Sequence, residues 1–100
     1  MNIKKATIVG VLQDWDVNDY RFDIERVNFD VPISALCFYT DDEINDMIVN
    51  GFYGGDDESV LGELVRIGLD DGWFNRSKLC RYYWQPEDPC ELKLEIEEEA

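Results

Sequence analysis

Carboxyl groups are the most abundant side chains in this sequence that could do chemistry. The 100 residues include 23 Asp and Glu against 9 Lys and Arg, a formal net charge of −14, and no His. Carboxylates can act as general acids or bases, bind divalent cations or present negative charge to a partner. Without His the chain lacks the commonest general base and metal ligand, and it has no G-x-S-x-G, Walker or dinucleotide-binding motif. We therefore expect no enzymatic activity, no cofactor and no resident metal.

One run of carboxylates has the spacing of a calcium-binding loop. Asp14, Asp16, Asn18 and Glu25 fall at positions 1, 3, 5 and 12 of an EF-hand count. Position 6 holds Asp19 where the sharp turn needs Gly, and the flanking residues alternate as in strands, whereas an EF-hand needs amphipathic helices. We expect an acidic hairpin loop here, with weak calcium binding as the alternative.

The negative charge is concentrated in two segments. Residues 41–71 carry ten carboxylates and one Arg, and residues 87–99 carry seven carboxylates and one Lys, whereas residues 73–85 carry three cations. Some of these acids fit as helix caps and first-turn dipole partners. A net charge of about 2 to 8 is enough to keep a small domain soluble, so the excess favours a basic protein partner. The carboxylates predicted to contact it are Asp41, Asp42, Glu43, Asp46, Asp56, Asp57, Glu58, Asp70 and Asp71.

Aromatic residues are the second candidate for partner contact. They form 13% of the chain, and most of them must lie in the core. The segment 78–85 has the composition of a strand, in which Tyr83 and Trp84 would point to opposite faces. We therefore predict that this pair offers an aromatic anchor at an interface.

The hydrophobic pattern predicts an α+β fold of about four mainly antiparallel strands in the order β-β-α-α-β-β. Residues 3–12 and 20–31 are predicted to form a hairpin, and 78–85 and 91–97 the other two strands. The apolar phase moves by one residue near Glu25 and Arg26, which indicates a β-bulge there. The segment 13–19 is expected to be a loop.

Two helices are predicted between the strand pairs, as a helical hairpin packed on one face of the sheet. Thr40 and Glu43 have the spacing of a capping box at the start of a helix over 41–50. Asp56 or Asp57 is expected to cap a second helix over about 58–69 that ends at Gly72. The residues expected to pack on the sheet are Ile44, Met47, Ile48, Leu61, Leu64 and Val65.

Length and cysteine content indicate one compact domain over residues 1–100, with fraying at 98–100. The apolar stretch 6–12 is too short and too interrupted for a signal peptide, so a cytoplasmic protein is expected. Three Cys, none in a C-x-x-C pair, favour reduced thiols. No apolar run could span a membrane, and the negative charge disfavours binding to nucleic acid or to anionic lipid.

In size, charge and compact α+β pattern the chain resembles the phage-encoded inhibitors of bacterial defence, namely anti-CRISPR proteins and antirestriction DNA mimics. The resemblance implies a non-enzymatic inhibitor, acting in the host cytoplasm, whose carboxylates occupy the basic groove of a nucleic-acid-binding complex. Two alternatives predict much the same surface. One is an immunity protein that neutralises a basic nuclease toxin, and the other is an acidic adaptor that binds through its aromatic residues.

Overall fold

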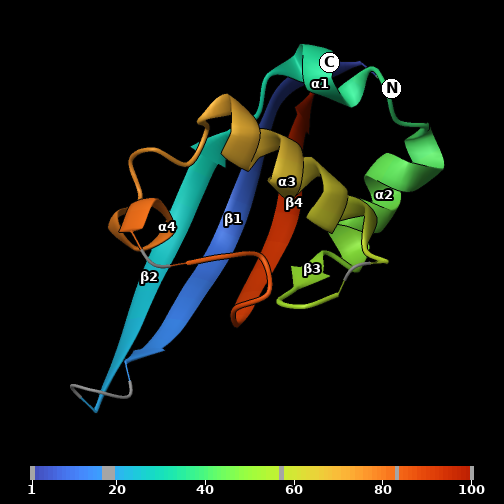
Figure 1. Ribbon diagram of the computed structural model, residues 1–100. Helices are drawn as coiled ribbons and strands as arrows, with labels where there is room; N and C mark the ends of the chain where they lie inside the picture. The colour runs from blue at the N-terminus through green and yellow to red at the C-terminus, as the bar shows by residue number, and fades with distance from the viewer. Residues whose placement is uncertain (1, 17–19, 57, 83, 100) are drawn as a thin grey trace.

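The computed structural model describes residues 2–16, 20–56, 58–82 and 84–99 and has an α+β fold (Figure 1). Its strands form an antiparallel sheet in the order β2-β1-β4-β3. The strands are β1 (Ile3–Asp16), β2 (Arg21–Asp30), β3 (Phe52–Tyr53) and β4 (Cys90–Glu98). The helices of the described residues are α1 (Ile33–Leu36), α2 (Asp41–Val49), α3 (Val60–Asp71) and α4 (Lys78–Tyr82). The predicted fold class and antiparallel sheet are therefore confirmed, whereas the order along the chain is β-β-α-α-β-α-α-β.

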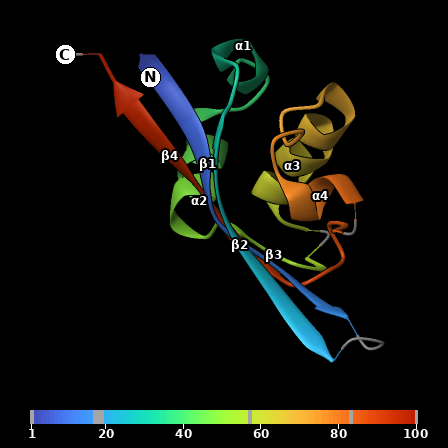
Figure 2. The ribbon, with the colours of Figure 1, turned by 90° about the vertical axis from the view of Figure 1, so that its left-hand side faces the viewer.

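The sheet has one covered face and one open face, because its residues alternate between core and solvent. Ile8 and Leu12 of β1 and Leu92 and Leu94 of β4 are buried, while Lys93 between the last two is exposed. Figure 2 shows α3 and α4 on the same side of the sheet. The helix α2 packs against β4 and α3, and it lies beside β4 at the end of the sheet opposite β2 (Figure 1). Since β3 also separates α2 from α3 in the chain, the two are not a simple helical hairpin.

Local signals place the start and end of α2 where the sequence predicts them. Thr40 Oγ1 accepts the Glu43 N–H at 3.1 Å, and Glu43 Oε1 accepts the Thr40 N–H at 2.9 Å, which completes the capping box. Gly51 follows the helix with φ of 68°, a left-handed conformation that suits glycine. Ile44 and Met47 are buried, as the predicted stripe requires.

The cap of α3 is Ser59, and the prediction of Asp56 or Asp57 is wrong. Ser59 Oγ accepts the Gly62 N–H at 3.1 Å, and its hydroxyl donates to the Gly51 carbonyl at 2.9 Å. Asp56 instead accepts the Glu58 N–H at 3.2 Å in the turn before the helix. The helix ends at Gly72 as predicted, and Leu61, Leu64 and Val65 are fully buried.

Residues 78–82 form the helix α4, so the strand predicted over 78–85 is wrong. Ser77 is buried, and its Oγ accepts the Cys80 N–H at 3.0 Å. Glu25 of β2 accepts hydrogen bonds from the Ser77 hydroxyl and the Leu79 N–H, which satisfies the first turn of the helix. A partner this distant in the chain leaves no local trace in the sequence. The remaining strand of the sheet is β3, for which the sequence pattern predicted no strand.

The β1–β2 hairpin is longer and more regular than predicted. Pairing runs without a shift from Thr7 opposite Asp30 to Asp16 opposite Arg21, so the bulge predicted near Glu25 and Arg26 is absent from this ladder of described residues. The apolar phase changes because Ile24 lies on the open face, where it is 61% exposed, while Glu25 takes a covered position and bonds α4. The residues expected as a loop continue β1 as far as Asp16.

The end of β4 pairs with the N-terminal end of the chain. Glu98 closes β4 opposite Ile3, and the Glu99 N–H donates to the Asn2 carbonyl at 3.0 Å. The described part of the segment expected to fray, Glu98 and Glu99, thus makes backbone contacts with residues 2–3.

Candidate acidic interaction surface

The first predicted carboxylates lie at the start of α2. Asp41 and Asp42 are exposed in its first turn, where the positive end of the helix dipole favours them. Glu43 is partly buried, because its carboxylate bonds the Thr40 backbone. Two of these three side chains are thus presented to solvent, and the third also stabilises the helix.

A second group converges on a hollow between the end of α2 and the turn before α3. The hollow has a volume of about 470 Å³, and its lining includes Asp46, Asp56 and Glu58 together with Tyr53. Asp46 Oδ1 accepts a hydrogen bond from the Asn50 amide, which fixes that carboxylate at the rim. The structure therefore brings together carboxylates that lie up to twelve positions apart in the sequence.

Glu63 belongs to the same surface and was missed by the sequence analysis. It is exposed on α3 and lines a neighbouring hollow of about 330 Å³ with Asp56 and Glu58. Burial raises the pKa of the Tyr39 hydroxyl, and the charges of Glu63 and Glu43 raise it further, so carboxylates of α2 and α3 both contribute to the negative potential at this group. The signal available in the sequence was the position of Glu63 on the polar side of the Leu61 and Leu64 stripe. We call the following residues the acidic surface: Asp41, Asp42, Glu43, Asp46, Asp56, Glu58 and Glu63.

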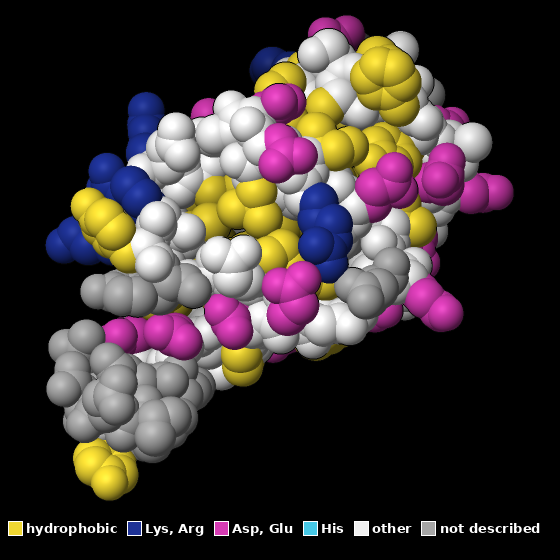
Figure 3. Space-filling view, in the orientation of Figure 1, with side chains coloured by type: hydrophobic (Ala, Val, Ile, Leu, Met, Phe, Trp, Pro, Cys, Tyr) yellow, Lys and Arg dark blue, Asp and Glu magenta, His cyan; other side chains and the backbone are white. Residues whose placement is uncertain are grey.

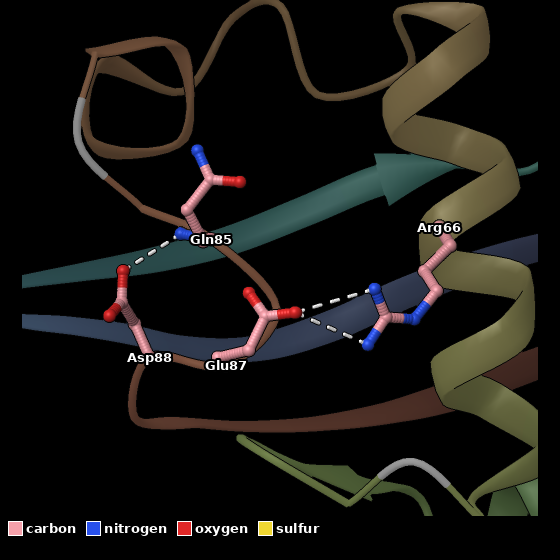
Figure 4. A network of polar contacts seen from close by, with 4 residues as sticks. All are labelled: Arg66, Gln85, Glu87 and Asp88. Atoms are coloured by element: carbon pink, nitrogen blue, oxygen red, sulfur yellow. Dashed lines mark hydrogen bonds and ion pairs between the residues drawn. The ribbon is translucent and has the colours of Figure 1, made fainter.

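Arg66 of α3 also lines the hollow formed with Asp56, Glu58 and Glu63, so one cation lies at the acidic surface. Its Nη2 lies 3.5 Å from Glu87 Oε1, in the turn that precedes β4 (Figure 4). The same turn is held by Asp88, whose Oδ2 accepts the Gln85 N–H at 2.8 Å. Both members of the Arg66–Glu87 pair are largely exposed, so the pair contributes little to stability, about 0 to 1 kcal/mol.

Asp70 and Asp71 lie apart from the acidic surface, at the last turn of α3. At about 1.5 Å per residue, Asp70 is about 10 Å further along the helix axis than Glu63. Carboxylates are disfavoured at a helix C-terminus, and the last turn contains no basic residue. Helix stability therefore does not explain why two aspartates occur at this position. The structure nevertheless places them away from the other predicted carboxylates.

The acids of β4 form a different surface with interleaved cations. Glu91, Glu95 and Glu97 are exposed on the open face, with Lys93 between them in the strand. Lys5 of β1 lies directly opposite Glu97. These cations reduce the local negative potential on the open face.

The predicted aromatic anchor is wrong for Trp84, which is only 1% exposed. Its indole Nε1–H donates to the Pro89 carbonyl at 3.3 Å, so both its ring and its polar atom are used within the fold. Tyr83 and Asp57 lie outside the described residues. Tyr82 is 66% exposed on α4.

The described members of the calcium count lie in paired strands. Asp14 of β1 is opposite Asp23 of β2, and Glu25 is opposite Leu12. The Glu25 carboxylate already accepts hydrogen bonds from Ser77 and Leu79. Asn18 lies outside the described residues.

Comparison with known protein families, curated proteins and solved structures gives no match for this chain. Among the residues that the structure describes, no group of three or more Cys, Asp or Glu is arranged to hold a metal ion. None of the helices in the described ranges combines the length and apolarity needed to cross a membrane.

Proposed function

We propose that this protein is a non-enzymatic inhibitor that binds the positively charged nucleic-acid-binding surface of a bacterial defence complex, as anti-CRISPR proteins and antirestriction DNA mimics do. Such an inhibitor would act in the host cytoplasm. The observation that supports the proposal is the acidic surface, in which carboxylates of α2, α3 and the turn between them converge around two adjoining hollows.

Helix capping does not explain this arrangement. Asp46 lies in the middle of α2 and Glu58 precedes the Ser59 cap, so neither is required to satisfy a helix terminus. Carboxylates held close together repel one another and oppose compaction. A basic partner would remove that repulsion and would be steered to the surface at long range.

The spacing is compatible with a nucleic-acid backbone. Asp42 and Asp46 lie one helical turn apart, about 6 Å along the axis, and phosphates of one DNA strand advance by about 3.4 Å. Carboxylates on two helices and a connecting turn can thus occupy several Lys and Arg sites of a groove that normally binds phosphates.

Affinity capture with the tagged protein, from bacterial cells that carry a CRISPR system and from cells that carry a nuclease toxin, tests the proposal. We expect recovery of a nucleic-acid-binding defence complex and competition between the protein and DNA for that complex. Reversal of Asp42, Asp46, Asp56 and Glu58 to Lys should abolish capture, because these side chains are exposed or lie at the rim of a hollow.

The matched control reverses Glu91, Glu95 and Glu97 on the open sheet face, and it should retain capture. Circular dichroism of both variants verifies that the fold survives. Recovery of a nuclease toxin would favour the immunity-protein alternative. Capture that persists after reversal of the acidic surface would refute charge mimicry.

A further inference from the structure

Large hydrophobic side chains are exposed around α1, next to the acidic surface. Phe38 is 87% exposed and Ile33 is 41% exposed, although both are residues that normally lie in a core. Figure 3 shows hydrophobic side chains gathered near α1 on the face of the molecule that Figure 1 presents to the viewer, with Asp and Glu side chains beside them. Exposed apolar groups bordered by charge are typical of protein contact sites.

A hollow of about 170 Å³ opens beside Ile33, between α1, β1 and the start of α2. A volume of this order suits one aliphatic or aromatic side chain, since a cavity of about 150 Å³ holds benzene. Its lining is mainly apolar, and the apolar members are Ile3, Ile33, Leu36, Tyr39 and Ile44.

The rim of this hollow is acidic on the side of α2. Asp41 lines it directly, and the exposed Asp42 follows in the same helical turn. Beyond the effect of burial, the charges of Glu63 and Glu43 raise the pKa of Tyr39, which is itself part of the lining, so their negative potential reaches the hollow. An apolar side chain flanked by Lys or Arg is complementary to both parts of this site. A second copy of the chain is not, because it would bring a second acidic rim against the first.

We propose that this hollow is an anchor site for a basic partner segment, in which one apolar side chain enters between α1 and α2 and flanking cations meet the acidic rim. The inference rests on the proposed function and adds a hydrophobic hot spot to it. Charge then steers the encounter, and the buried anchor holds the complex at salt concentrations that screen exposed charges.

Two short synthetic peptides of equal Lys content test the site, one with Leu and the other with Ser at the remaining positions. Titration of the isotope-labelled protein by nuclear magnetic resonance should show that the Lys/Leu peptide perturbs Ile33, Tyr39 and Asp41. The Lys/Ser peptide should perturb residues of the acidic surface and leave the residues that line the hollow between α1 and α2 unperturbed. The double variant Ile33→Ser, Phe38→Ser should weaken binding of the Lys/Leu peptide by about ten-fold and leave the Lys/Ser peptide unchanged.

The matched control is Ile24→Ser, which alters a side chain of β2 that is 61% exposed on the open face and lines none of the hollows described above. It should bind both peptides as the parent does. Equal affinity of the parent for the two peptides, or an unchanged affinity of the double variant, would overturn the anchor while leaving charge-based binding in place. Self-association in sedimentation that the double variant abolishes would also overturn it, by identifying a second copy as the occupant. Loss of capture through the acidic surface is measured separately, by the charge-reversal variant described above.

Discussion

Glu25 and Ser77 are joined by a hydrogen bond of 2.7 Å between residues 52 positions apart in the chain. The same Glu25 oxygen accepts the Leu79 N–H at 3.0 Å, and Ser77 accepts the Cys80 N–H. One carboxylate of β2 therefore fixes the first turn of α4. This contact connects the helix-covered layer to the edge strand of the sheet.

Glu25→Ala should lower the free energy of unfolding by about 1–3 kcal/mol, because it removes a charged acceptor and leaves the buried Ser77 hydroxyl without its partner. Urea denaturation followed by circular dichroism measures the change. Glu91→Ala is the matched control, since this glutamate is exposed on the open face, and it should change stability by less than about 0.5 kcal/mol. Equal effects of the two substitutions would show that the contact with α4 does not contribute.

Calcium should leave the thermal midpoint of unfolding nearly unchanged. Glu25, the twelfth position of the EF-hand count, is already engaged by Ser77 and Leu79, and Asp14 is paired within a regular ladder. Differential scanning calorimetry with and without excess calcium measures the shift. A rise of several degrees that Asp14→Asn abolishes would contradict this prediction.

Leu64→Asp should unfold the domain. Leu64 is fully buried, and an unpaired buried charge costs several kcal/mol against a total stability of about 5–15 kcal/mol. The near-ultraviolet circular dichroism spectrum should be lost. Ile67→Asp, on the same helix at a position that is 38% exposed, should keep that spectrum. A native spectrum for Leu64→Asp would mean that this side chain lies outside the core.

Stability should decline at alkaline pH through two thiols. Burial, and to a smaller extent the charge of Glu25, raises the pKa of Cys80 from 9.0 to about 11. Burial raises the pKa of Cys90 from 9.0 to about 12. Because the folded state holds these protons more tightly, their contribution is complete below pH 9 and is lost as the pH rises from 9 through about 12.

Urea midpoints measured across that pH range test the effect. The double variant Cys80→Ala, Cys90→Ala should show a smaller decline than the parent, although its stability below pH 9 is lower because the substitutions leave cavities. Cys37→Ala is the control, since this thiol is exposed and its removal should not alter the slope. An identical slope in the parent and the double variant would show that the two buried thiols do not govern it.

Much of the local structure could be predicted from the sequence because its signals act over a few residues. The capping box of Thr40 and Glu43, the left-handed Gly72 and the alternation of Leu92 and Leu94 each depend on neighbours within about one turn or one strand. Part of the candidate site could also be predicted from the sequence. The concentration of carboxylates in residues 41–71 identified most of the acidic surface, including Asp46 and Glu58.

The tertiary structure decided what depends on distant residues. Residues 78–82 are helical because Glu25, more than fifty positions earlier in the chain, completes their first turn. The grouping of Asp46 with Glu58, and the separation of Asp70 from both, follow from how α2 and α3 pack. Net charge is a property of composition, whereas the position of each charge relative to the others is fixed by burial of the apolar faces beneath them.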